Sequence, residues 1–69
     1  MLNLVNMLQL KPGDTVRIRD RIKGQETSSQ VMAASAELIL TCNKDRFIER
    51  FSPDGWNMTR TKRIVTGIE

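Results

Sequence analysis

The chain has 69 residues, and its 11 Lys and Arg against 8 Asp and Glu give a net charge of +3 at pH 7. A chain of this length forms one domain with a small core, and its ordinary proportions of apolar and charged residues exclude wholesale disorder. A single cysteine excludes an internal disulfide, and the lack of a secretory signal pattern indicates a reducing cytoplasm. The apolar start of the chain is too short to span a bilayer.

Residues 1–7 predict a short N-terminal arm or helix in front of a barrel that spans residues 8–69. The apolar side chains of the arm have two interpretations. They pack a loosely ordered terminus onto the barrel, or they anchor a partner protein. The residues concerned are Leu2, Leu4, Val5, Met7 and Leu8. The sequence Lys11-Pro12-Gly13-Asp14 then predicts a turn, because proline fixes φ and glycine accepts a positive φ.

Apolar and basic side chains alternate along residues 15–23. Because successive side chains of a strand point to opposite faces, this pattern predicts a half-buried strand. Its inward residues are Val16, Ile18 and Ile22, and its outward residues are Arg17, Arg19, Arg21 and Lys23. Cations spaced about 7 Å apart repel one another, so the row favours an anionic partner. Asp20 interrupts the apolar face and either marks a bulge or pairs with a Lys or Arg.

The polar run Gln25–Gln30 predicts a mobile loop. The next segment has two interpretations. Good helix formers and a serine N-cap candidate are typical of a helix over residues 30–38, whereas short β-strands at even spacing predict strands at 30–34 and 38–42. We favour the two strands.

Alternation returns in residues 45–51 and predicts a core strand. Phe47 and Phe51 point inward, whereas Arg46, Ile48 and Arg50 point outward. The solvated Asp45 and Glu49 pair with Arg46 and Arg50. We expect one core made of Val16, Ile18, Leu38, Leu40, Phe47, Phe51 and Ile64. Ser52-Pro53-Asp54-Gly55 predicts a type I turn. Residues 56–63 form a strand or a loop, and residues 64–68 form a last strand beside the first.

Several pieces of the sequence carry a resemblance to known proteins. They are Leu10-Lys11-Pro12-Gly13-Asp14-Thr15-Val16-Arg17-Ile18, Val31 followed by Ile39-Leu40-Thr41, Phe51-Ser52-Pro53-Asp54-Gly55, and Ile64-Val65-Thr66-Gly67-Ile68. Because of these pieces, residues 8–69 resemble small SH3-like or KOW-like β-barrels, particularly short regulators encoded by bacteriophages. The resemblance implies a mainly β fold, an antiparallel barrel of about five strands. It also implies a binding module that docks on nucleic acid, the ribosome or RNA polymerase.

The residue types needed for most catalysis are missing. Without histidine or tyrosine, the chain cannot assemble a Cys-His or Ser-His nucleophile pair, and one cysteine without histidine cannot build a structural zinc site. The four glycines are scattered and form no phosphate-binding loop. We therefore expect no enzymatic activity, no cofactor and no metal.

Three functions remain. The leading hypothesis is a non-catalytic, monomeric regulator in the cytoplasm of a bacterial host, which binds RNA polymerase and modulates transcription. The second is direct binding of DNA or RNA, and the third is a structural or assembly role in a virion through an exposed strand edge.

The candidate binding residues are mainly basic. They are Arg17, Arg19, Arg21, Lys23, Arg60, Lys62 and Arg63, together with Trp56 as a ring for base stacking and Leu4 and Val5 as an apolar anchor. There is an alternative for each group. Arg17, Arg19 and Arg21 pair across strands with Glu37, Glu49 or Glu69, and Trp56 is a partly exposed lid of the barrel.

Overall fold

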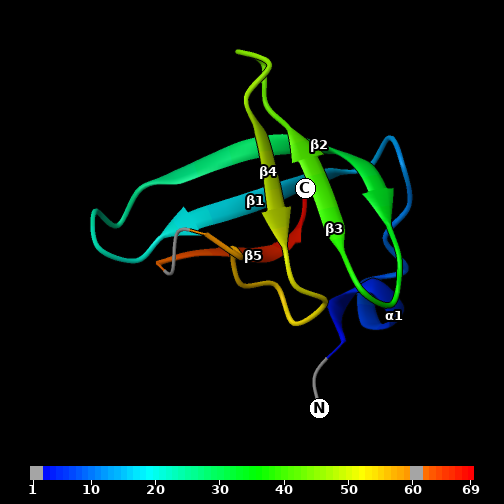
Figure 1. Cartoon of the computed structure of the whole chain (residues 1–69). Coiled ribbons are helices and arrows are strands. Elements are labelled where there is room, and N and C mark those ends of the chain that lie inside the picture. The colour runs from blue at the N-terminus through cyan, green and yellow to red at the C-terminus, as the bar shows by residue number, and fades with distance from the viewer. Residues whose placement is uncertain (1–2, 60–61) are drawn as a thin grey trace.

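The computed structural model describes residues 3–59 and 62–69. Five antiparallel strands form one curled sheet, a half-barrel, with a short helix at its N-terminus (Figure 1). The elements are α1 (Leu4–Leu8), β1 (Thr15–Asp20), β2 (Glu26–Ala34), β3 (Ile39–Cys42), β4 (Ile48–Phe51) and β5 (Arg63–Ile68). The predicted fold class is therefore confirmed, and the architecture is compatible with an SH3-like fold. Within the described ranges, no helix is long and apolar enough to cross a membrane.

The strand order in the sheet is β4-β3-β2-β1-β5. Four strands follow one another as hairpins, and β5 returns to pair with β1, as predicted for the last strand. The segment 55–58 hydrogen-bonds to both outer strands. The Met58 N–H donates to the Arg50 carbonyl at 3.0 Å, and the Asn57 N–H donates to the Arg63 carbonyl at 2.9 Å. This segment therefore links the two edges of the half-barrel.

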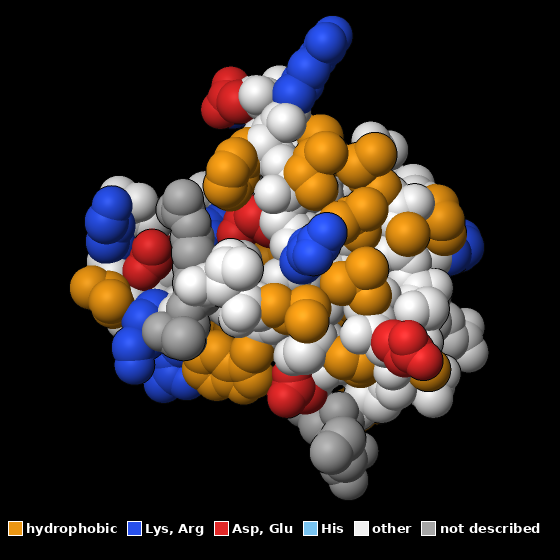
Figure 2. Space-filling view, in the orientation of Figure 1, with side chains coloured by type: hydrophobic (Ala, Val, Ile, Leu, Met, Phe, Trp, Pro, Cys, Tyr) orange, Lys and Arg blue, Asp and Glu red, His pale blue; other side chains and the backbone are white. Residues whose placement is uncertain are grey.

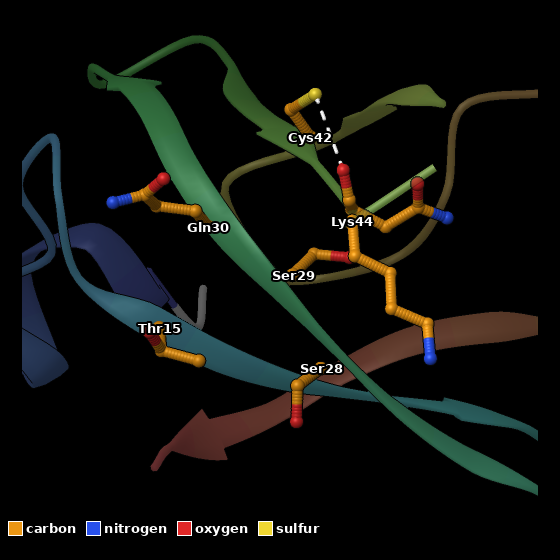
Figure 3. A pocket seen from close by; sticks show the side chains of 7 residues that line it. Thr15, Ser28, Ser29, Gln30, Cys42 and Lys44 are labelled. Carbon is orange, nitrogen blue, oxygen red and sulfur yellow. Dashed lines mark hydrogen bonds between the residues drawn. The ribbon is translucent and has the colours of Figure 1, made fainter. Parts of the chain in front are cut away.

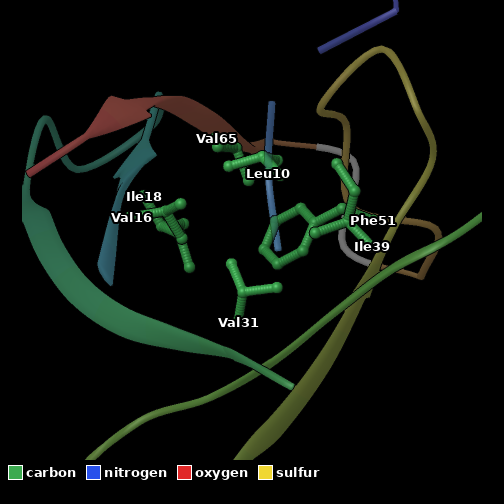
Figure 4. Packing of buried hydrophobic residues seen from close by; sticks show 7 residues of the cluster. All are labelled: Leu10, Val16, Ile18, Val31, Ile39, Phe51 and Val65. Carbon is green, nitrogen blue, oxygen red and sulfur yellow. The ribbon is translucent and has the colours of Figure 1, made fainter. Parts of the chain in front are cut away.

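The inner face of the sheet encloses a small apolar core (Figure 4). Its members are Leu10, Val16, Ile18, Val31, Ile39, Phe51 and Val65. The half-buried side chains of Leu4, Val5 and Leu8 pack against this core from α1. The helix therefore belongs to the packed structure, and its side chains extend the core at the N-terminal end of the chain.

The sequence prediction of the core was right for Val16, Ile18 and Phe51 only. Ile39 and Val65 take the inward positions of β3 and β5, because the alternation in these strands is set one residue away from the predicted register. The neighbouring predicted core residues are consequently only half-buried. They are Leu38, Leu40 and Ile64.

Phe47 is not a core residue, since its side chain is 45% exposed. The hairpin between β3 and β4 explains the error. Arg46 adopts a left-handed backbone conformation with φ of 63°, and the Asn43 N–H donates to the Phe47 carbonyl at 3.1 Å. Phe47 therefore closes the hairpin loop, and the strand with its regular alternation begins only at Ile48.

The first hairpin also differs from the prediction. β1 ends at Asp20, so Arg21 and Lys23 lie in a turn, and Ile22 is 74% exposed instead of buried. Residues 26–30, predicted as a mobile loop, are part of β2 and pair with β1. Asp20 caps the turn, because its Oδ1 accepts the N–H groups of Ile22 and Lys23, both at 3.0 Å.

Two other local predictions are confirmed. Residues 30–34 and 39–42 are strands, so the helical alternative is wrong. The turn at residues 52–55 forms as expected, since the Gly55 N–H donates to the Ser52 carbonyl at 2.8 Å.

Candidate functional site

Exposed cations continue from the outer side of β1 to the tip of the first hairpin. Arg17 and Arg19 alternate with buried residues and are exposed. Arg21 follows the strand, and its N–H donates to the Lys62 carbonyl at 2.7 Å, which brings residue 62 beside the hairpin. We call this surface the basic face. It consists of Arg17, Arg19, Arg21, Lys23, Lys62 and Trp56.

Trp56 joins the basic face through Arg21. The Arg21 guanidinium carbon lies 5.6 Å from the centroid of the Trp56 ring, which is the geometry of a cation–π contact. Trp56 also forms a β-bridge with Ile64, whose partner in β1 is Arg19. The half-buried ring is therefore positioned by β5 and by Arg21, next to the row of arginines.

No cation of the basic face lies within ion-pair distance of a carboxylate among the described residues, although the charge of Lys23 helps to lower the pKa of Asp20. There the only Lys or Arg nitrogen within 4.0 Å of a carboxylate oxygen belongs to Arg63. Glu26 is the register partner of Arg19 in β2, but the two side chains form no ion pair. The Glu69 carboxylate accepts a hydrogen bond from the Ser28 hydroxyl at 2.8 Å. The interpretation that Arg17, Arg19 and Arg21 form cross-strand ion pairs is therefore wrong for the carboxylates that were predicted.

Arg63 has a different role from its basic neighbours. Its Nε donates to Glu49 Oε2 at 2.7 Å and its Nη2 to Glu49 Oε1 at 2.8 Å. The hydrogen bonds that Arg63 donates to Glu49 raise the pKa of the Arg63 guanidinium, with burial acting in the opposite direction. Asn57 Nδ2 donates to the same carboxylate at 2.8 Å. Arg63 is thus held inside the half-barrel by an ion pair, and we leave it out of the basic face.

Glu49 was predicted as a solvated partner of Arg46 or Arg50, and this is wrong. Its side chain is buried on the inner face of β4, where alternation places it between the outward-facing Ile48 and Arg50. Alternation alone would have placed Glu49 inward with Phe51. A buried carboxylate needs a cation, and Arg63 was the available partner across the sheet.

The hairpin tip that carries Arg21 and Lys23 is a well-bonded turn. The Gly24 N–H donates to the Asp20 carbonyl at 2.7 Å, and the Asp20 carboxylate accepts two further N–H groups. The N–H of Lys23 is the main cause that lowers the pKa of Asp20, and the N–H of Ile22 adds to it. In Figure 2, Lys and Arg side chains gather at this end of the molecule.

The apolar anchor predicted at the N-terminus is not a free arm. Leu4 and Val5 pack against the core, and the Leu4 N–H donates to the Pro53 carbonyl at 2.7 Å. Their binding to a partner stays a prediction. Leu2 and Arg60, which belonged to the predicted sites, lie outside the described residues.

A pocket of about 180 Å³, lined mainly by residues of polar type, lies between β2 and the β3–β4 hairpin (Figure 3). Its lining residues are Thr15, Ser28, Ser29, Gln30, Cys42, Asn43 and Lys44. The Cys42 thiol donates to the Asn43 carbonyl at 3.6 Å. Among the residues that the structure describes, no group of three or more His, Cys, Asp or Glu side chains could hold a metal ion.

Comparison with known proteins identified no family model, no curated protein and no solved structure that matches this chain.

Proposed function

We propose that this protein is a non-catalytic nucleic-acid-binding module that contacts phosphates through its basic face. The observation that carries the proposal is the set of exposed Arg and Lys side chains without carboxylate partners in the described part of the chain. Such cations form no close ion pair within the described part of the protein, whereas each phosphate that they neutralise releases counterions from the nucleic acid.

The spacing of the cations supports contacts with successive phosphates. Alternate residues of a strand lie about 7 Å apart, so Arg17 and Arg19 present guanidinium groups in a row along β1. Arg21 extends the row at the end of the strand, and Lys62 lies beside it. Guanidinium groups suit this role because their planar donors match phosphate oxygens.

Trp56 adds a surface on which a base can stack. One side of the ring is approached by Arg21, and stacking on an aromatic ring stabilises a base by roughly 1–3 kcal/mol. A single ring cannot read a sequence. We therefore expect affinity that depends strongly on salt and only weakly on the base sequence.

The test is a titration of fluorescently labelled DNA and RNA with the parent protein and with a variant that carries Arg17→Ala, Arg19→Ala and Arg21→Ala. The logarithm of the affinity should fall steeply with salt for the parent, and the slope should decrease by roughly one unit for each arginine removed. Arg50→Ala is the matched control, because Arg50 is exposed on β4, outside the basic face. Its salt slope should equal that of the parent.

Trp56 supplies a second measurement without any label. It is the only tryptophan, and the chain has no tyrosine, so the intrinsic fluorescence reports on this ring almost alone. Nucleic acid should change the Trp56 emission if a base stacks there. Absence of binding even near 50 mM salt, or equal weakening by Arg50→Ala, would refute the proposed function.

The second candidate is docking on a host protein complex, with RNA polymerase as the favoured target because of the resemblance to phage regulators. The unpaired cations also suit an acidic protein surface, where they would mainly accelerate association. Binding of the protein to purified RNA polymerase that has been freed of nucleic acid, together with negligible affinity for DNA and RNA, would favour this candidate.

A further inference from the structure

We propose that the tip of the β1–β2 hairpin is a wedge for the minor groove of double-stranded DNA, with Ile22 as the side chain that inserts between base pairs. This inference rests on the proposed function, because it names the nucleic acid and the way in which it is engaged. Its basis is the juxtaposition of an exposed isoleucine with the cations of the basic face.

Ile22 is unusually exposed for an isoleucine. Its side chain is 74% exposed, the highest value among the large exposed hydrophobic residues of the described chain. Its sequence neighbours are the cations Arg21 and Lys23, both exposed. An apolar side chain flanked by cations has the chemistry of the side chains that architectural proteins insert between base steps from the minor groove.

The turn holds Ile22 in place. Asp20 Oδ1 accepts the N–H groups of Ile22 and Lys23 at 3.0 Å, the Gly24 N–H bonds to the Asp20 carbonyl, and the Asp20 N–H bonds to the Gln25 carbonyl at 2.8 Å. The Asp20 carboxylate is also the acidic group nearest to the tip in sequence, and it accepts both N–H bonds through one oxygen, Oδ1. A pre-ordered wedge loses less conformational entropy when it inserts than a flexible loop does.

The shape of the β1–β2 hairpin determines which of its parts can enter the minor groove. Figure 1 shows that the β1–β2 turn projects from one end of the sheet, where it is accessible to a ligand. The backbones of paired strands lie about 4.8 Å apart before atomic radii and side chains are added, and the minor groove of B-DNA is roughly 6 Å wide, so the tip enters rather than the whole hairpin. The cations behind the tip then lie where they contact the flanking phosphates.

The same geometry favours duplex DNA over other anionic surfaces. The minor groove of an RNA duplex is wide and shallow, so it does not grip a narrow wedge. A lipid surface also attracts cations next to an apolar residue, but a single isoleucine contributes too little apolar area for stable membrane binding.

The experiment uses the full chain and a DNA duplex that contains 2-aminopurine, whose fluorescence rises when its base is unstacked. We expect the parent protein to increase this fluorescence and the minor-groove ligand netropsin to compete with it. Ile22→Ala should abolish the increase and weaken duplex binding roughly tenfold, while the salt slope stays at the parental value because no charge is removed.

Ile48→Ala is the matched control. Ile48 is 53% exposed on β4, so it is a second surface isoleucine outside the basic face. This variant should keep the fluorescence increase and the parental affinity. Thermal melts of both variants should overlay that of the parent, since both side chains are largely exposed.

Other outcomes would overturn the wedge without touching the proposed function. Parental duplex affinity for Ile22→Ala, without any 2-aminopurine signal, would show that the protein binds phosphates but inserts nothing. Binding confined to single strands would do the same. Binding to phosphatidylserine vesicles that Ile22→Ala abolishes, with DNA binding unchanged, would assign the tip to a membrane surface. If the parent protein binds no nucleic acid at all, the proposed function itself is refuted.

Discussion

Arg63 of β5 and Glu49 of β4 form a two-point ion pair inside the half-barrel, with N···O distances of 2.7 and 2.8 Å. The two strands occupy opposite edges of the sheet order, so this pair joins the sheet's ends through side chains. The backbone bonds of residues 57 and 58 do the same through the main chain. The pair and the segment therefore act together in closing the fold.

We predict that Glu49→Gln lowers the free energy of unfolding by roughly 3 kcal/mol, because it leaves the partly buried Arg63 guanidinium without a counter-charge. Urea unfolding followed by circular dichroism measures the change. Glu37→Gln is the control, since Glu37 is exposed in the turn after β2 and its substitution removes the same charge. Equal midpoints for the two variants would show that the ion pair contributes nothing to stability.

The sequence was sufficient where side-chain alternation decides the outcome. It placed Val16 and Ile18 inward and Arg17 and Arg19 outward, because alternation within a strand is a local property. The prediction of an inward side chain was wrong for Ile22, because β1 ends before the alternation of apolar and basic residues ends. The end of the strand depends on the hydrogen bonds of Asp20 with the turn, which no periodicity reveals.

The ion pair shows a second limit of sequence reasoning. Glu49 was predicted as a solvated partner of Arg46 or Arg50, and Arg63 was predicted as one of the cations that bind a partner. Their contact exists only once the sheet curls and brings β4 and β5 towards each other. The exposure of the cations in β1 and the adjoining turn was predicted correctly, because these residues are close together in the chain, whereas their binding to a partner stays a prediction.

The two phenylalanines provide a direct test of the core. Phe51 is fully buried and Phe47 is 45% exposed. Truncation of a buried phenylalanine typically costs about 3–5 kcal/mol, so Phe51→Ala should leave little folded protein at physiological temperature. Phe47→Ala should cost clearly less. Thermal melts followed by circular dichroism compare the two, and a larger destabilisation by Phe47→Ala would contradict the packing described here.

We predict that Arg46→Gly stabilises the protein by about 1 kcal/mol. Arg46 has a φ of 63°, a left-handed conformation that glycine adopts without the steric cost of a Cβ atom. The reciprocal control is Gly24→Ala, because Gly24 has a φ of 70° and open space around it, so only the backbone conformation resists the substitution. Chemical denaturation should move the two midpoints in opposite directions. A shift in the same direction would rule out backbone conformation as the cause.

Asp54 should make the stability depend on pH in the acidic range. The Ser52 hydroxyl and then the Trp56 N–H donate to its carboxylate, and both bonds lower the pKa of Asp54 in the folded state. In the unfolded chain an aspartate titrates near a pKa of about 3.9. Because the folded pKa is the lower one, the bonds stabilise the fold fully above this pH and progressively less as the pH falls through the folded pKa.

The contribution of Asp54 should be modest, below about 1 kcal/mol, because solvent screens a group near the surface. Carbon NMR of the carboxyl groups should place the Asp54 pKa below that of an unperturbed aspartate, and Ser52→Ala should raise it by removing the largest cause. In Asp54→Asn, the free energy of unfolding should fall less steeply below about pH 4 than in the parent. If Asp54 titrates at the ordinary value in the folded parent, or if both proteins lose stability equally with acid, these hydrogen bonds do not stabilise the charged carboxylate.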